Sequence, residues 1–176
     1  MKKIATENLN LFYGAFQALK SITMSIEERH ITSIIGPSGC GKSTLVRIFN
    51  RINDLIEDVR IDGRVLIDEK NIYDPSYDLV ALRKNVGMVF QRPNPFPLSI
   101  YDNVAFGPRI HRMTSEREMP GLVEGSLRAV NLWEDLKDRL HRHALNMPLE
   151  QQQRLCIARL IAVKPDVLLM DEPCSA

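Results

Sequence analysis

The stretch GPSGCGKST occupies residues 36–44 and directly follows the apolar run ITSII. Its spacing, G-x-x-x-x-G-K-[ST], is typical of a loop whose backbone N–H groups surround phosphate oxygens. Such a loop lies between a buried strand and a helix. Apolar residues recur at helical spacing from Leu45 to Leu55. The sequence therefore predicts a buried strand over 31–36, a phosphate-binding loop and then a helix.

The predicted loop assigns distinct tasks to its residues. Its nucleotide-binding candidates are Gly36, Pro37, Ser38, Gly39, Cys40, Gly41, Lys42, Ser43 and Thr44. The Lys42 ammonium would neutralise the β- and γ-phosphates, and the Ser43 hydroxyl would be a Mg²⁺ ligand. The N-terminus of the following helix would add a partial positive charge. The structural alternative is a glycine turn before a helix, and the strand–loop–helix context disfavours it.

A second candidate site follows the apolar run VLLM, residues 167–170. A fully apolar strand is typical of a parallel sheet, and ligands bind at the carboxyl ends of such strands. We assign Asp171 to Mg²⁺, through water, and Glu172 to catalysis, as the carboxylate that polarises an attacking water. A strand that ends in two acidic residues is common, so both assignments depend on the loop at 36–44.

Gln91 and Tyr13 complete the candidate site. Gln91 follows a predicted strand, VGMVF, and precedes a proline-rich loop at 92–97. Its neutral amide could contact both Mg²⁺ and the attacking water, so we treat it as a catalytic and metal-binding candidate. Tyr13 lies among the N-terminal strands, and its ring could stack on a nucleobase. The alternatives are an ordinary glutamine at the start of a loop and a half-buried strand tyrosine.

Composition excludes several classes of protein. Apolar residues make up 44% and charged residues 26% of the 176-residue chain, and the net charge is +1. These values are typical of a globular protein with one sizeable core, and they give no strongly basic surface for nucleic acid. The cysteines, Cys40, Cys156 and Cys174, are too few and too scattered for a disulfide framework or a zinc site. We expect one domain, reduced thiols and no nucleic-acid partner.

Strands and helices are predicted to alternate along the chain. Apolar and polar residues alternate over residues 1–30, as in antiparallel strands with one solvated face. Helices are predicted over 116–141 and over 149–164, the second ending before Pro165. Together with the apolar strands, this order indicates an α/β fold.

The order of these motifs resembles the ATP-binding subunits of ABC transporters. The resemblance is carried by GPSGCGKST, Gln91, QQQRLCIARLIAVKP and VLLMDEP. Within that family, a longer middle part is similar to the subunits of phosphate importers. The segments concerned are NRINDL (50–55), IYDP (72–75), residues 81–111 and LWEDLKDRL (132–140).

The resemblance implies a fold and a set of partners. The fold would be a P-loop NTPase core of the ABC-ATPase type with an antiparallel β subdomain and a helical subdomain at about 92–153, within a single domain over 1–176. Two such subunits, as a homodimer or paired with another ATP-binding subunit, would clamp two ATP molecules with Mg²⁺. Tyr13 would stack on adenine, and Gln91 would link the Mg²⁺ site to the membrane permease subunits of a phosphate importer. The protein would be peripheral, on the cytoplasmic face of the cell membrane.

Two departures from the family pattern stand out. Where the family has leucine-serine-glycine-glycine, this chain has Met147-Pro148-Leu149-Glu150. The Glu150 carboxylate would face a phosphate docked from the second subunit, and two unit charges ~4 Å apart repel by about 4 kcal/mol at an effective dielectric of 20. The family also continues beyond Ala176 with a further strand and a histidine, so we expect the domain to be C-terminally incomplete.

These departures predict ATP binding with poor hydrolysis. One alternative is that Pro148, at the first helical position, and Glu150, in the first turn, are tolerated because they stabilise the helix. Another is that the chain is a degenerate or regulatory nucleotide-binding module without transport activity of its own.

Overall fold

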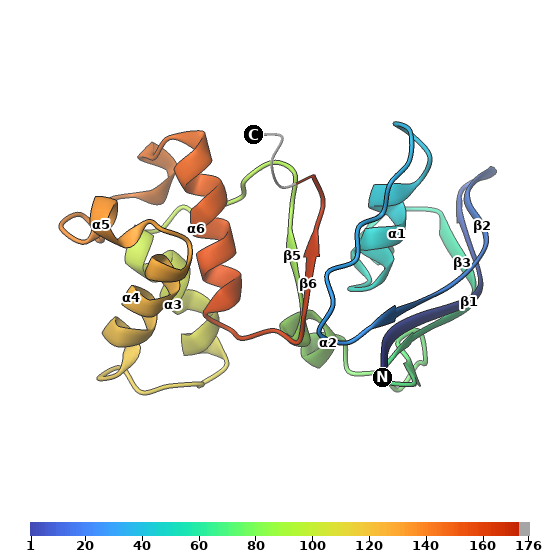
Figure 1. The fold of residues 1–176 in the computed structure, drawn as a ribbon, viewed down its shortest axis with the longest axis horizontal. Coiled ribbons are helices and arrows are strands. Elements are labelled where there is room, and N and C mark those ends of the chain that lie inside the picture. The colour runs from blue at the N-terminus through green and yellow to red at the C-terminus, as the bar shows by residue number, and fades with distance from the viewer. Residues whose placement is uncertain (173–176) are drawn as a thin grey trace. The chain divides into compact units, whose positions relative to one another are not determined.

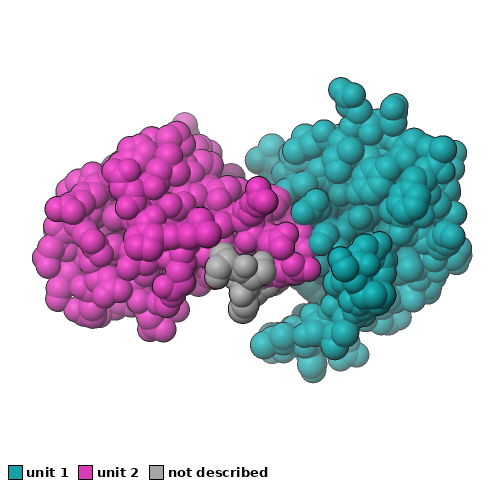
Figure 2. Space-filling view, turned by 90° about the horizontal axis from the view of Figure 1, so that it is seen from above, with its two compact units in different colours: residues 1–83 teal, residues 84–176 magenta. Residues whose placement is uncertain are grey.

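The computed structural model describes residues 1–172, so Pro173 of the VLLMDEP motif and Cys174 lie outside the described residues. The chain divides into two compact units, Met1–Arg83 and Lys84–Ala176, which Figure 2 colours teal and magenta. The first unit is built around an antiparallel sheet. The second combines a short parallel sheet with a helical core. The combination of helices with an antiparallel and a parallel sheet fits the predicted α/β class.

The sheet of the first unit has four antiparallel strands in the order β2-β1-β3-β4 (Figure 1). They are β1 (Lys2–Tyr13), β2 (Phe16–Glu27), β3 (Val59–Ile67) and β4 (Lys70–Asn71). Alternating apolar residues of these strands are buried, among them Ile4, Leu9, Leu11 and Val65. The antiparallel strands predicted for residues 1–30 are confirmed.

The pairing of these strands is interrupted by bulges. Between Thr6 and Leu9, β1 advances by one residue more than either neighbour, and Asn8 there has a φ of 47°. Opposite this bulge Gly63 has a φ of 99°, and a Cβ at that position would lie 2.5 Å from the Asn8 carbonyl oxygen. A second bulge lies on β2 at Ser21, whose φ is 48°. Only glycine fits at residue 63, because the bulged strand approaches it so closely.

The helix predicted after the glycine loop is shorter than its apolar stripe. Helix α1 spans Lys42–Ile48, and a separate 3₁₀ turn, η1, spans Ile52–Leu55. The helical conformation is interrupted between them at Arg51, which has a left-handed φ of 58°. Ile48 is fully buried, whereas Leu55 is 73% exposed, so the stripe does not continue as one helical face. A last helix, α2 (Leu79–Asn85), crosses the boundary of the two units.

The prediction of a buried strand over residues 31–36 was wrong. These residues form no strand, and Ile31 and Ile35 are 100% and 92% exposed. A strand exists only where a neighbour pairs with its backbone N–H and C=O groups. In the part of the chain that the structure describes, no strand pairs with this segment.

In the second unit, β5 (Val86–Val89) and β6 (Val167–Met170) pair in parallel, with Val86 opposite Val167 and Val89 opposite Met170. Both predicted strands are confirmed, and the parallel sheet expected for the second is formed by pairing with the first. All four residues of β5 are buried, in keeping with an apolar strand of a parallel sheet. Parallel pairing brings the carboxyl ends of the two strands to the same edge, so the residues after Val89 and Met170 emerge together.

The helical core of the second unit is formed by α3 (Ile100–Ile110), α4 (Met119–Ala129), α5 (Trp133–Leu136), the 3₁₀ turn η2 (Ala144–Asn146) and α6 (Leu149–Ile161). Its buried side chains run from Ile100 to Ala162. The single helix predicted over 116–141 is divided, because Asn131 takes a left-handed φ of 55° after α4. Helix α6 ends at Ile161 rather than 164, and Lys164 is likewise left-handed, with a φ of 54°.

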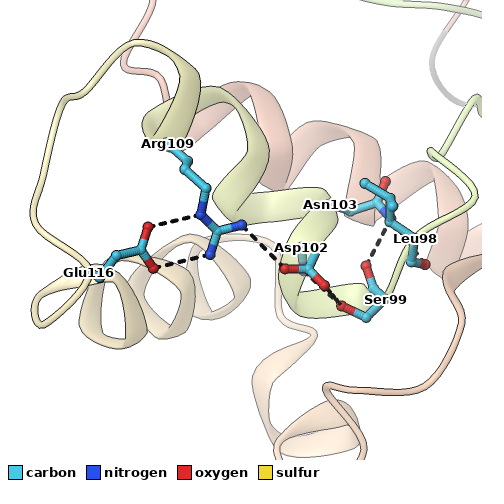
Figure 3. Close-up of polar contacts among 6 residues, drawn as sticks. All are labelled: Leu98, Ser99, Asp102, Asn103, Arg109 and Glu116. Atoms are coloured by element: carbon cyan, nitrogen blue, oxygen red, sulfur yellow. Dashed lines mark hydrogen bonds and ion pairs between the residues drawn. The ribbon is translucent and has the colours of Figure 1, made fainter.

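A polar network fixes the start of α3 (Figure 3). The Ser99 hydroxyl accepts a hydrogen bond from the Asp102 backbone N–H at 3.0 Å and donates to the Asp102 carboxylate at 2.6 Å. Arg109 connects that carboxylate, at 3.3 Å, to Glu116, at 2.9 Å. The Ser99 hydrogen bond, aided by Arg109, holds the pKa of Asp102 below its ordinary value. The segment that precedes α3 therefore ends at a defined cap.

Candidate functional site

The glycine loop runs from Gly36 into α1 and depends on left-handed glycines. Gly39 has a φ of 78°, and Gly41, the N-cap residue of α1, has a φ of 97°. A Cβ on Gly41 would lie 3.1 Å from the Ala18 carbonyl oxygen and from the Leu19 side chain, whereas a Cβ on Gly39 would meet nothing within 4 Å. Gly41 thus lets the loop pass close to β2, and Gly39 only provides a turn.

Lys42 lies with its ammonium group inside the curve of its own loop. Its Nζ donates to the carbonyl oxygens of Gly36, at 2.9 Å, and Pro37, at 2.8 Å. An ammonium group has three N–H donors, so these contacts use two of them. The side chain therefore has two tasks: it holds the two arms of the loop together, and it places a positive charge where the loop converges.

Tyr13 is brought to Thr44, in the first turn of α1. The Tyr13 hydroxyl lies 3.4 Å from both the Thr44 hydroxyl and the Asn53 side-chain oxygen. Asn53 is fully buried and donates to the Thr44 backbone carbonyl at 2.9 Å. Sequence reasoning missed Asn53. Its only signal is a polar residue within an apolar stripe, which is a weak one.

A second part of the candidate site lies at the carboxyl ends of β5 and β6. The Gln91 side-chain amide donates to the Glu172 carboxylate at 2.8 Å, although the two residues are 81 apart in the sequence. Asp171 is 5% exposed, and its backbone N–H donates to the Val89 carbonyl at 3.1 Å. Glu172 has a left-handed φ of 47°, which turns its side chain away from the line of the strand. The structure thus brings Gln91 and Glu172 together, as the parallel sheet requires.

Helix α6 begins at the segment that differs from the family pattern. Pro148 is the N-cap residue, not the first helical residue as predicted, and its side chain makes no capping hydrogen bond. Glu150 lies in the first turn and forms an ion pair with Arg154. The Gln152 side chain donates back to the Leu145 and Met147 carbonyls, at 3.3 and 2.8 Å. The helix start is therefore stabilised from within and carries a carboxylate among its first N–H groups.

The candidate metal ligands are oxygen donors: the Ser43 hydroxyl, the Gln91 amide and the Asp171 carboxylate. Ser43 belongs to the first unit, and the other two belong to the second. Among residues 1–172, no group of three or more His, Cys, Asp or Glu side chains could hold a metal by itself. This donor set fits Mg²⁺, which binds through one or two carboxylates together with phosphates rather than in a protein cage.

Across the described residues, no helix is both long enough and apolar enough to span a bilayer.

Comparisons with known proteins identify the family and the fold. The model of the family described as ABC transporter matches residues 19–175. A solved structure of cbiO1 from Clostridium perfringens, part of the ABC transporter complex cbiONQ, is 31% identical with a TM-score of 0.81, over 99% of this chain and 67% of that chain. A bacterial Atm1-family ABC exporter with ATP bound is 24% identical with a TM-score of 0.83, over 99% of this chain and 30% of that chain, and shows the fold alone.

The predicted fold class is confirmed by the family match and the cbiO1 structure. The family match covers most of the chain and includes the loop at 36–44, Gln91, Asp171 and Glu172, whereas Tyr13 precedes the matched residues. The chain belongs to the ABC transporter family, of which it carries the ATP-binding domain.

Proposed function

We propose that this chain binds ATP with Mg²⁺ as a subunit of a membrane transporter. The observation that carries the proposal is the loop Gly36–Thr44, with two left-handed glycines and the Lys42 ammonium held at its centre. Backbone N–H groups and a fixed cation in one curve form a site for the oxygens of a polyphosphate. Tyr13 would stack on the adenine ring, as its hydroxyl contact with Thr44 keeps it beside the loop.

The second unit would supply the catalytic groups. Glu172 would accept the proton of an attacking water, and Gln91, bonded to it at 2.8 Å, would orient both the carboxylate and the water. Asp171, with Ser43 and Gln91, would hold Mg²⁺. When bound, the ion would neutralise charge on the phosphates. The backbone of buried Asp171 is held by its bond to Val89, so the start of its side chain would be placed before the ion binds.

Hydrolysis by this chain would be weak. In a two-subunit arrangement, the start of α6 would face the phosphate held by the other subunit. There Pro148 has neither a hydroxyl nor an N–H to donate, and the exposed Glu150 carboxylate repels an anion. The Glu150–Arg154 ion pair offsets part of that repulsion. The same features favour a second function, a regulatory nucleotide-binding module that pairs with an intact subunit.

Phosphate import is the finer proposal, and it is supported by the sequence resemblance over residues 50–55, 72–75, 81–111 and 132–140. The partners would be membrane permease subunits, and a second ATP-binding subunit, identical or not, would complete the dimer. A helical subdomain at about 92–153 would meet the permease, placing the protein on the cytoplasmic face of the cell membrane. Exposed Phe106 and Ile110 on α3 offer apolar contacts for such a partner.

Equilibrium binding of a fluorescent ATP analogue, followed by steady-state phosphate release, tests the proposal. We expect saturable Mg²⁺-dependent binding with phosphate release near background. Robust release that Glu172→Gln abolishes would contradict the weak-hydrolysis proposal. No binding at all would refute the nucleotide site.

A triple substitution tests the role of the start of α6, and cross-linking separates the two candidate functions. Pro148→Ser with Leu149→Gly and Glu150→Gly removes the carboxylate and provides a hydroxyl at the start of α6. We expect this variant to dimerise with ATP, measured by size-exclusion chromatography, with Glu124→Gln as a matched control for charge. Cross-linking from Leu98→Cys to phosphate permease subunits would support the transporter subunit, and its absence in a folded protein would favour the regulatory module.

A further inference from the structure

The loop that carries Gln91 is attached to α6 by the side chains of Gln153 and Arg159. Gln153 is buried and donates to the Phe90 carbonyl at 2.9 Å. Two turns later, Arg159 donates to the Asn94 carbonyl at 3.1 Å and to the Asn94 side-chain oxygen at 3.0 Å. These contacts hold the loop on both sides of Gln91. The residue that reaches Glu172 is therefore placed by a helix that does not itself contain it.

Arg159 is unusual among the charged residues of the second unit. Burial lowers the pKa of its guanidinium, and none of the described carboxylates forms an ion pair with it. The guanidinium lies over the Phe96 ring, 4.2 Å from the ring centroid. A cation that is partly removed from water without a counter-charge is costly, so its hydrogen bonds to Asn94 and its ring contact provide the compensation. The free energy lost in burying this cation suggests that the position of the loop is important to the protein.

The opposite side of the same loop is held by Asn103 of α3. Asn103 is 1% exposed, and its side-chain oxygen accepts from the Phe96 N–H at 2.7 Å. Its amide group donates to the carbonyl of Phe96 at 3.1 Å and to that of Ser99 at 2.9 Å. The side chain thus binds the loop as a neighbouring strand would. Figure 3 shows Asn103 with Leu98 and Ser99, next to the cap of α3.

We propose that Arg159 and Asn103 are positioning residues for Gln91, which fix the loop at 90–99 so that the Gln91 amide reaches Glu172. The effect of these residues on Mg²⁺ and ATP binding rests on the proposed function. The structural part of the proposal concerns contacts within the second unit. It also makes α6 the element that connects the Pro148–Glu150 segment with Gln91, because that segment begins α6 and side chains of α6 hold the loop on both sides of Gln91.

The first test reports on Gln91 without nucleotide. In ¹⁵N-labelled protein the Gln91 side-chain amide signal, assigned by its loss in Gln91→Ala, reports the contact with Glu172. We expect Arg159→Met, which keeps the length but removes the donors, to move that signal toward the position of a glutamine that has no carboxylate partner. Arg159→Lys should not restore it, because one ammonium cannot reproduce the paired bonds and the flat ring contact. Arg128→Met, an exposed arginine of α4, is the control.

Asn94→Ala is a second variant that tests the same contact if Arg159→Met does not fold. Asn94 is exposed, so its loss removes the side-chain acceptor from the loop without opening the core. We expect the same displacement of the Gln91 signal in this variant, with a smaller amplitude. An unchanged Gln91 signal in folded Arg159→Met or Asn94→Ala would overturn the positioning role.

The second test asks whether Arg159 acts through Gln91. Mg²⁺ titrations of the protein with an ATP analogue give the Mg²⁺ affinity of wild type, Gln91→Ala, Arg159→Met and the double variant. Outer-shell residues typically change metal affinity by about tenfold or more, and we expect each single loss to be roughly of that size. The double variant should lose no more than the larger single loss, because both changes remove one interaction.

Multiplied effects in the double variant would overturn the proposal, because they would show that Arg159 acts independently of Gln91. If wild type binds no ATP, the proposed function fails, whereas the Gln91 signal still tests the positioning role by itself.

Discussion

The two parts of the candidate site are built in opposite ways. The loop at 36–44 is exposed over most of its length and is shaped by backbone conformation and by one lysine. The corner around Gln91 and Glu172 is shaped by side chains of other elements, among them buried Gln153, buried Asn103 and half-buried Arg159. A loop whose shape depends on its own glycines can be recognised in the sequence from their spacing. A corner shaped by distant side chains is visible only once the chain is folded.

Thiol reactivity should show the largest difference between the two parts. Cys40 lies in the loop and is exposed, whereas Cys156 of α6 is buried, and burial raises the pKa of its thiol. The thiolate is the reactive form, and a buried thiol reacts only through local opening. In a Cys174→Ser background, we expect Cys40 to react with a disulfide reagent roughly a hundredfold faster than Cys156. Equal rates would mean that the corner is no better ordered than the loop.

ATP should protect Cys40 from the same reagent and leave the rate at Cys156 unchanged. Protection of Cys156 alone would place the nucleotide away from the loop.

Lys42→Ala should produce the next largest effect. Charge-assisted hydrogen bonds contribute about 1.5–3 kcal/mol, which corresponds to roughly a tenfold to hundredfold loss of ATP affinity. The variant also loses the two bonds to the Gly36 and Pro37 carbonyls, so the loop should lose its shape. Titration with a fluorescent ATP analogue measures the affinity, with exposed Lys70→Ala as control. Unchanged affinity would remove the phosphate-loop assignment.

Two glycine variants sharpen the comparison within the loop itself. Both Gly39→Ala and Gly41→Ala place a side chain in a left-handed conformation, at a cost of about 1–2 kcal/mol. Only the Gly41 side chain would also press on β2, where a Cβ lies 3.1 Å from Ala18. We therefore expect Gly41→Ala to lower the free energy of unfolding more than Gly39→Ala, in urea titrations. The reverse order would mean that the loop does not lie against β2 in solution.

The smallest predicted effect concerns the cap of α3 and its dependence on pH. The pKa of Asp102 is lowered, chiefly by Ser99, so its charged form stabilises the fold at neutral pH and this contribution is lost as the pH falls through the folded pKa. Asp102→Asn should lower the free energy of unfolding by roughly 0.5 kcal/mol at pH 7, after allowance for solvent screening. Near pH 2 the variant and wild type should unfold alike. A loss of equal size at both pH values would assign the effect to packing.

The motifs with fixed spacing could be predicted from the sequence, because local chemistry determines them. The glycine loop, the apolar strands at 86–90 and 167–171 and the N-terminal antiparallel strands all follow from short-range patterns. The segment 31–36 has the same apolar character as β5 but no paired neighbour, and composition alone does not reveal pairing. The helix breaks at Arg51 and Asn131 depend on single left-handed residues, which apolar periodicity does not register.

The supporting residues of the site could not be predicted for a related reason. Asn53, Asn103 and Arg159 act through contacts with backbone groups that lie elsewhere in the sequence, and any polar residue in a helical pattern resembles a solvated one. The assignment of Tyr13, the glycine loop, Gln91, Asp171 and Glu172 to ATP and Mg²⁺ remains a prediction.

The bulges of the first sheet affect how molecules of this protein meet one another. Strand β2 is an edge of the described sheet, and a long, flat edge is a template for pairing with a strand of another molecule. The displacement at Ser21 removes that regularity, since its backbone N–H is taken by the Asn10 side chain at 2.9 Å. A second copy could therefore align with only a few residues of β2 before its hydrogen bonds fell out of register. Gly63 accommodates a further irregularity on the other side of β1, and we expect a sheet so interrupted to pair poorly, edge to edge, with a second copy at high concentration.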